Sequence, residues 1–232
     1  MGYDLHITRA FLSYDSERYP ILGTEVDDLV RDEPGLTIPP DAPRRPDFCY
    51  LAWESPDPDD DGHLWFEAGR ITTKNPRPEV IRRMTVLAAR LDAWVIGDDG
   101  EVYGWDGNRV VDRQRDAHAF ILNARYITRG TWFGGMNGQA PIRLDEWEQL
   151  AAAQPDFVTM TRIEATLPSG VRWISCPPVV CWTGHPSGRP RPFFFDDDVI
   201  EVRQADEPTV RRMAELAMSL GAKVVDDNDQ AA

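Results

Sequence analysis

Apolar and polar positions along the chain follow two periods, one typical of strands and one of helices. The two kinds of side chain alternate from Tyr3 to Thr8, as in a strand with one buried face. Segments 48–53 and 63–74 also predict strands, the second broken by a hairpin turn at Ala68-Gly69. Beyond them, apolar residues spaced by three and four predict a long helix with one buried face, formed by Val80, Met84, Leu87 and Leu91.

The two ends of the chain share one pattern, which indicates an internal repeat. Segment 81–91 recurs at 210–220, with the same Arg-Arg-Met and Leu-Ala positions. Near the start, Ile7-Thr8-Arg9 recurs as Ile127-Thr128-Arg129. Further blocks match in the same order: Ile21, Glu25, Leu29 and Pro34 with Ile142, Glu146, Leu150 and Pro155, Ala52-Trp53 with Cys181-Trp182, and Trp65-Phe66 with Phe194-Phe195. We therefore interpret the chain as a tandem duplication, with a first repeat at 1–115 and a second at 116–232.

Each repeat is predicted to contain the same elements in the same order. A short acidic helix follows the first strand, and in the first repeat Thr24 is expected to cap it. The long helix of the second repeat is expected to end at Gly221, in a left-handed C-cap. Strands and helices without regular β-α-β alternation predict the α+β class, with antiparallel sheets and helices packed on one face. We expect the two sheet-plus-helix repeats to be related by a pseudo-twofold axis.

The net charge of the chain makes some classes of binding partner unfavourable. The chain has 232 residues, 39 acidic and 25 basic, for a formal net charge of −14. A field of this sign repels nucleic acid and anionic membranes, so we expect neither as a partner. The acidic residues concentrate in the first repeat, at 57–61 and in the helix around Asp27-Asp28 and Asp32-Glu33. Such a surface would speed association with a basic partner and make it sensitive to salt.

The cysteines and the hydropathy pattern predict the compartment. Cys49, Cys176 and Cys181 are odd in number and match no zinc spacing, so we expect free thiols. No stretch approaches the ~18 consecutive apolar residues of a membrane-spanning helix. The start of the chain lacks the basic-then-apolar pattern of a signal peptide. These features predict a cytoplasmic protein.

The segment Asp57-Pro58-Asp59-Asp60-Asp61-Gly62 has two interpretations. It matches the first half of a calcium-binding loop, with glycine at the sixth position. The twelfth position, however, is Ala68, and the flanking segments predict strands where a calcium loop has helices. A solvated acidic loop between two strands is the interpretation that we favour.

No other pattern predicts a reaction centre. The four histidines, His6, His63, His118 and His185, form no pair with metal-ligand spacing. The glycine-rich segment 134–138 lacks the lysine and the strand-to-helix context of a phosphate loop. There is also no G-x-S-x-G segment. We therefore expect no catalytic residues, no metal site and no cofactor.

Three segments together carry a resemblance to known proteins. They are the opening Tyr3-Asp4-Leu5-His6-Ile7-Thr8-Arg9, the helix with Ile21 and Glu25, and the stretch that ends in Gly97-Asp98-Asp99-Gly100-Glu101. The chain resembles a group of small bacterial proteins, some of them similar to immunity proteins of polymorphic toxin systems. That resemblance implies a protein that binds and blocks a cognate toxin. It implies no catalytic residue.

Charge and resemblance together predict a non-catalytic acidic binding protein, an immunity-type protein that neutralises a basic protein toxin such as a nuclease. The expected contact residues are Asp57, Asp59, Asp60 and Asp61, with Trp105 and Trp182 as aromatic anchors. The alternative is an enzyme or small-ligand-binding protein with a site in a cleft between the repeats, drawing on His6, Glu67, Tyr103 and Arg129. A structural subunit of a larger assembly is a third possibility. The pattern leaves the oligomeric state open.

Overall fold

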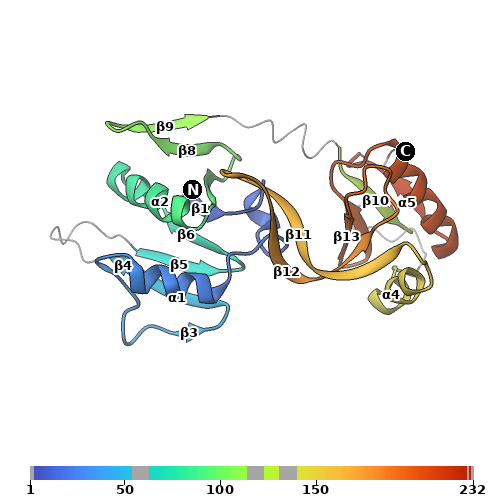
Figure 1. Ribbon diagram of the computed structural model, residues 1–232, viewed down its shortest axis with the longest axis horizontal. Coiled ribbons are helices and arrows are strands. Elements are labelled where there is room, and N and C mark those ends of the chain that lie inside the picture. Colours follow the sequence, from blue (N-terminus) through green and yellow to red (C-terminus); the bar gives the residue numbers. More distant parts are fainter. Residues whose placement is uncertain (1–2, 54–62, 114–122, 131–139, 229, 231–232) are drawn as a thin grey trace. The chain divides into compact units, whose positions relative to one another are not determined.

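The computed structural model describes residues 3–53, 63–113, 123–130, 140–228 and 230 (Figure 1). Within these residues the chain forms two antiparallel sheets, of nine and six strands, and four α-helices. The predicted α+β class is therefore confirmed. The chain divides into two compact units, which are described separately below. Unit 1 comprises Met1–Arg115 and Glu164–Pro177, and unit 2 comprises Asp116–Ile163 and Pro178–Ala232.

Unit 1 contains the nine-stranded sheet. Its strands follow the order β2-β4-β5-β6-β1-β7-β8-β9, and β3 pairs with β4. The strands are β1 (Asp4–Thr8), β2 (Leu36–Thr37), β3 (Arg44–Arg45), β4 (Phe48–Trp53), β5 (His63–Glu67), β6 (Arg70–Lys74), β7 (Trp94–Gly97), β8 (Val102–Trp105) and β9 (Val110–Arg113). The helices are α1 (Gly23–Asp32) and α2 (Pro78–Arg90), and a 3-10 turn spans Ser13–Asp15.

The hairpin between β5 and β6 lies where the sequence predicts it. Ala68 and Gly69 both adopt positive φ, 51° and 73°. Two left-handed residues in succession match the twist of the strands they join, which explains the tight two-residue connection. Glycine is also required at the second position, because a Cβ on Gly69 would lie 2.7 Å from the carbonyl oxygen of Ser16.

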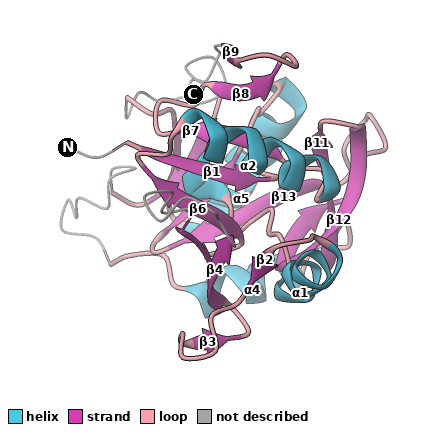
Figure 2. Ribbon diagram, turned by 90° about the vertical axis from the view of Figure 1, so that its left-hand side faces the viewer, coloured by secondary structure: helices cyan, strands magenta, loops and turns pink. Residues whose placement is uncertain are grey.

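Helix α2 packs on β1, β7 and β8 with its predicted face (Figure 2). Met84 and Leu87 are completely buried, and Val80 and Leu91 are each 5% exposed. Helix α1 begins differently from the prediction. Thr24 lies inside the helix, and the cap is made by Glu25, whose carboxylate accepts a hydrogen bond from the Leu22 amide at 2.8 Å. The expected Thr24 cap is therefore wrong, because the helix starts two residues earlier, at Gly23, with Leu22 in the N-cap position.

Unit 2 contains the six-stranded sheet, in the order β11-β12-β13-β14-β10-β15. The strands are β10 (Arg125–Thr128), β11 (Phe157–Leu167), β12 (Gly170–Trp182), β13 (Arg191–Asp196), β14 (Val199–Val202) and β15 (Lys223–Val225). The helices are α4 (Leu144–Ala152) and α5 (Glu207–Leu220). As predicted, Gly221 ends α5 in the left-handed conformation, with φ 60° and ψ 35°. The core of unit 2 includes Ile127, Trp147, Phe193, Ile200 and Met213.

The long hairpin of β11 and β12 is absent from the sequence prediction (Figure 1). Residues Glu164–Pro177 of this hairpin group with unit 1. There the indole N–H of Trp94 donates to the carbonyl oxygen of Thr166 at 3.3 Å. The amide of Ser169 donates to a carboxylate oxygen of Asp92 at 3.0 Å. The part of the hairpin at Glu164–Pro177 is therefore held by contacts within unit 1.

No helix in the described residues is both long and apolar enough to cross a lipid bilayer.

Candidate functional site

The residues predicted to contact a partner differ in where they lie in the structure. Asp57, Asp59, Asp60 and Asp61 lie outside the described residues. Trp105 lies on β8 and is half-buried. Trp182 ends β12 and is only 6% exposed, and its indole N–H donates to a carboxylate oxygen of Asp156 at 2.7 Å. Trp182 therefore belongs to the core of unit 2 and presents little surface to a partner.

The acidic helix α1 is largely neutralised by neighbouring arginines. Arg31 reaches Asp28 at 2.7 Å and Asp32 at 3.1 Å. Arg44 of β3 reaches Asp27 at 2.5 Å, and Arg90 at the end of α2 reaches Glu33 at 3.1 Å. A carboxylate that is paired within the chain contributes little long-range field. The acidic cluster predicted from the sequence is thus present, but its charge is offset locally.

Uncompensated carboxylates gather instead in an open groove of unit 2, with a volume of about 650 Å³. The start of α4 and the turn between β13 and β14 line it, and we call it the acidic groove. Its polar and aromatic lining consists of Arg143, Asp145, Glu148, Phe195, Asp197 and Asp198.

The charges of the acidic groove are unevenly paired. Arg143 holds Asp145 with two hydrogen bonds, of 2.8 and 3.1 Å. The hydrogen bond from Arg143 lowers the pKa of the Asp145 carboxyl below its usual range. Within the described part of the chain, Glu148, Asp197 and Asp198 have no ion-pair partner. The groove therefore carries three negative charges that nothing in its lining neutralises.

Apolar surface lies beside these charges. Phe195 is half-buried and lines the groove, and Leu144 at its rim is 50% exposed. Carboxylates next to an aromatic ring form a suitable environment for an ammonium or guanidinium group, which pairs with the acids and stacks on the ring. Asp197 is held in a two-residue turn with φ 52°, so the acidic tip has a defined backbone. The arrangement suits a basic side chain presented by another molecule.

The dispersed residues of the alternative hypothesis divide between the units. His6, Glu67 and Tyr103 belong to unit 1, and Arg129 belongs to unit 2. His6 pairs with Ile96 in the sheet and Tyr103 with Val95, so their side chains lie on opposite faces. Glu67 is exposed at the end of β5. The structure thus places His6 and Tyr103 on strands that are separated by β7, and on opposite faces of the sheet.

His6 is buried, with hydrogen-bond partners on both ring nitrogens. Its Nδ1 lies 3.0 Å from the hydroxyl of Thr72, and its Nε2 lies 3.3 Å from a carboxylate oxygen of Asp98. Burial lowers the pKa of the imidazole below its usual value, although the hydrogen bond to Asp98 opposes that change. On the other face, the Tyr103 hydroxyl donates to Glu101 at 2.9 Å, and burial followed by this bond raises the pKa of Tyr103.

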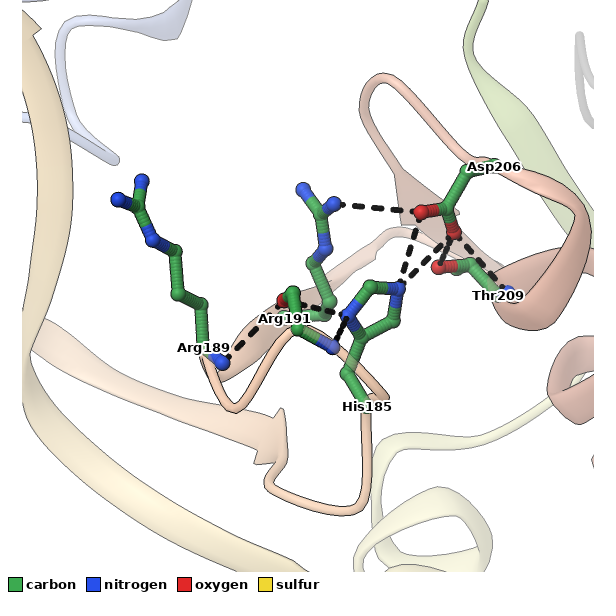
Figure 3. Close-up of polar contacts among 6 residues, drawn as sticks. His185, Arg189, Arg191, Asp206 and Thr209 are labelled. Atoms are coloured by element: carbon green, nitrogen blue, oxygen red, sulfur yellow. Dashed lines mark hydrogen bonds and ion pairs between the residues drawn. The ribbon is translucent and has the colours of Figure 1, made fainter.

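A second polar cluster of unit 2 surrounds the loop between β12 and β13 (Figure 3). The ring of His185 is buried there, with Ser187 on one side and Asp206 on the other. Asp206 caps α5 and accepts hydrogen bonds from the amide of Thr209 at 3.2 Å and its hydroxyl at 2.6 Å. Partial burial raises the pKa of Asp206, but the hydrogen bonds from Thr209 and His185 outweigh it and lower this pKa to about 2.

Metal binding finds no support in these residues. Among the described side chains, no group of three histidine, cysteine or acidic residues is arranged to hold a metal ion. In the described part of the chain, Cys49, Cys176 and Cys181 form no disulfide. Burial raises the pKa of Cys49 and Cys176.

The comparisons with known proteins identify no relative. The chain matches no protein-family model, and no curated protein or solved structure shows significant similarity to it. Its function therefore has to be argued from its own residues.

Proposed function

We propose that the chain is an acidic binding protein of the immunity type, which neutralises a basic protein toxin by docking it at the acidic groove. One observation carries the proposal: Glu148, Asp197 and Asp198 stand unpaired around Phe195 in an open concave surface. Neutralisation in this scheme is steric and electrostatic, because the groove takes basic residues that the toxin would otherwise use to hold an anionic substrate.

The net charge and the exposed leucine support the same function by different physical effects. A net charge of −14 attracts a basic partner over distances of about 10 Å, which raises the association rate. Leu144, half exposed at the rim, supplies apolar area that is removed from water once the partner is seated. Charge then determines how fast the partner arrives, and buried apolar surface slows its departure.

The contact residues predicted from the sequence do not all belong to the proposed docking surface. Trp105 is half-buried on β8 of unit 1 and stays a predicted contact. The acidic segment 57–61 also stays a prediction, because it lies outside the described residues. Trp182 has no part in the proposed surface, because its ring packs in the core of unit 2.

We also propose that the two units arose by duplication. In unit 1 five strands follow the order β4-β5-β6-β1-β7, and in unit 2 the order β12-β13-β14-β10-β15 is its counterpart. Ile7 pairs with Ile71 and Val95, just as Ile127 pairs with Ile200 and Val224. The offset that aligns segment 81–91 with 210–220 in the sequence repeat also aligns Ile71 with Ile200 and Val95 with Val224. The packing of helices on one face and the pseudo-twofold axis stay predictions.

The test of the proposed function uses the genes that flank the coding sequence. Each flanking gene with a basic product is expressed alone and together with this chain, and growth of the host is measured. The proposal expects one product to be toxic alone and harmless in the presence of the chain. If the chain relieves the toxicity of none of these products, the proposal is wrong.

The variant that links this effect to the groove is E148Q/D197N/D198N. The matched control is E17Q/D41N/D99N, which removes the same number of charges from exposed carboxylates of unit 1. Both variants lower the net charge equally. Protection should be lost with the groove variant and kept with the control, because only the groove variant removes the carboxylates that hold the toxin. Equal protection by the two variants would place the docking surface elsewhere.

A further inference from the structure

The hydrogen bonds around His185 define the tautomer of its neutral ring. The backbone N–H of Ser187 donates to Nδ1 of His185 at 3.1 Å, so in the neutral ring Nδ1 is the nitrogen without a proton. The proton is then on Nε2, which donates to the two carboxylate oxygens of Asp206 at 3.1 and 3.0 Å. The Ser187 hydroxyl lies 2.6 Å from the same Nδ1. Its proton is therefore directed at the lone pair of the imidazole.

From this geometry we propose that Ser187 is a nucleophile, with His185 as its general base and Asp206 as the carboxylate that positions the imidazole. The three groups form a serine-histidine-carboxylate chain, in which serine meets Nδ1 and the carboxylate meets Nε2. The ring is held rigidly: His185 is 6% exposed and contacts Trp182 edge to face, with centroids 5.3 Å apart. Ser187 itself is exposed, so an incoming substrate can reach its hydroxyl.

Helix capping does not account for this cluster. Asp206 already caps α5 through Thr209, and that contact needs neither His185 nor Ser187. In unit 1 the corresponding helix α2 begins at Pro78 without any side-chain cap. The buried imidazole is thus an addition to what the start of such a helix requires. Packing of this loop would also not require the serine hydroxyl to approach Nδ1, the imidazole nitrogen that carries no proton.

Two arginines indicate the substrate class. Arg189 and Arg191 extend their guanidinium groups toward the same side of the loop (Figure 3). Arg191 lies 3.4 Å from Asp206, and its buried Nε has no hydrogen-bond partner in the described part of the chain. The amides of Ser187, Gly188 and Arg189 are already engaged. Arg191, whose side chain is 30% exposed, is therefore the side-chain donor that we assign to a developing oxyanion, and we infer that the substrate is an ester that carries a negative charge.

The reaction is a two-step ester hydrolysis. The Oγ of Ser187 attacks the ester carbonyl while its proton moves to Nδ1 of His185, and that proton then leaves with the alcohol. Water attacks the acyl-serine in the second step, and its proton returns through His185 to the Ser187 hydroxyl. The products are one alcohol and one carboxylic acid, and no other co-reactant is consumed. This activity is separate from toxin docking, because it uses the opposite end of β13 from the acidic groove.

The first experiment is labelling with a fluorophosphonate probe, followed by intact mass and peptide mapping. The serine displaces fluoride from phosphorus, so a reactive serine gains one phosphonyl group. We expect one label, on Ser187, and none in S187A. The control S219A removes another exposed serine, one with no imidazole partner in the described contacts, and should label like the wild type. No label on the wild type, or a label that persists in S187A, overturns the proposal.

Two further variants separate chemistry from structure. H185Q should lower the labelling rate at least about a hundredfold, as loss of a general base does. D206N keeps the helix cap, because asparagine caps helices as well as aspartate, but it removes the charge that positions the imidazole. Its melting temperature should stay near that of the wild type while the labelling rate falls at least about tenfold. Wild-type labelling rates in both variants would assign the cluster a purely structural role.

The hydrolysis rates of two esters test the proposed substrate class. Wild-type protein should hydrolyse the succinate monoester of p-nitrophenol faster than p-nitrophenyl acetate, because the extra carboxylate pairs with the arginines. R191Q should reduce that preference. Hydrolysis of both esters at one rate contradicts the assignment of an anionic substrate. None of these results depends on toxin protection, so failure of one proposal leaves the other to be judged separately.

Discussion

Arg9 holds Glu25 through both terminal nitrogens of its guanidinium group, at 2.9 and 2.7 Å. The same group donates to the carbonyl oxygen of Leu91 at 2.9 Å. One side chain thus joins the end of β1, the start of α1 and the end of α2. In unit 2 Arg129 makes the equivalent contacts, with Glu146 and with the carbonyl oxygen of Leu220.

This relationship predicts a large effect of the R9A substitution on unit 1. The Arg9 side chain is 10% exposed. Its loss removes the donor to the carbonyl oxygen of Leu91 and leaves the Glu25 carboxylate with only the Leu22 amide among its described donors. We expect the free energy of unfolding to fall by about 2–4 kcal/mol. The matched control is R31A, because Arg31 is 65% exposed and solvent screens its ion pairs. Urea unfolding followed by tryptophan fluorescence measures both, and similar losses in the two variants would contradict the assignment.

His6 predicts a loss of stability in mild acid. Its folded-state pKa is lowered, mainly by burial, so the unfolded chain binds this proton more readily than the folded chain. The stability from neutral His6 is therefore present above about pH 6.5 and declines as the pH falls through the unfolded value. H6Q cannot titrate and should remove this part of the pH dependence. Unfolding curves of wild type and H6Q between pH 5 and 7.5 test it; parallel pH profiles would count against a lowered pKa.

Asp206 predicts a second loss, at lower pH. Its folded-state pKa is about 2, below the ordinary value of 3.8, so the folded chain prefers the carboxylate. The resulting stability is present above about pH 4 and is lost as the pH falls toward 2. Because the side chain is 43% exposed, solvent screening limits the contribution to about 1 kcal/mol. The difference in stability between wild type and D206N should shrink across this range; a difference that stays constant would refute the interpretation.

The acidic groove predicts salt-sensitive binding of arginine-rich peptide. Nona-arginine serves as the probe, titrated by calorimetry in low salt and in about 0.3 M NaCl. Wild type and the control E17Q/D41N/D99N should bind with similar affinity, whereas E148Q/D197N/D198N should bind about a hundredfold more weakly, from about 1 kcal/mol for each lost charge. If the control loses as much affinity as the groove variant, binding reflects the net charge alone.

Local signals predicted much of the fold. Ala68-Gly69 and Gly221 carry backbone requirements that can be recognised from a few residues, and both lie where they were expected. The hairpin of β11 and β12 was missed because Pro177 and Pro178 interrupt the strand pattern, and because many of its side chains are exposed on both faces. Its contacts, such as that between Asp92 and Ser169, join residues far apart in the sequence, and no local pattern reveals them.

The candidate sites were harder to predict. Glu148 and Asp198 line one groove only because α4 lies near the β13–β14 turn, and these two residues are far apart in the sequence. His185 and Ser187 are close neighbours in sequence, but Asp206 completes their cluster from the start of α5. The local charge at α1 depends on ion pairs that the sequence does not reveal. The carboxylates of α1 predicted an acidic surface, whereas the arginines that neutralise them come partly from β3 and α2.

The most direct test of the docking proposal is an inhibition titration of the flanking basic product that proves toxic in the growth assay. The activity of a fixed amount of purified toxin is measured against increasing amounts of wild-type protein and of E148Q/D197N/D198N. We predict complete inhibition at equimolar wild type, and about a hundredfold more of the groove variant for the same effect. Equal inhibition by both proteins, or none by the wild type, would contradict the proposal.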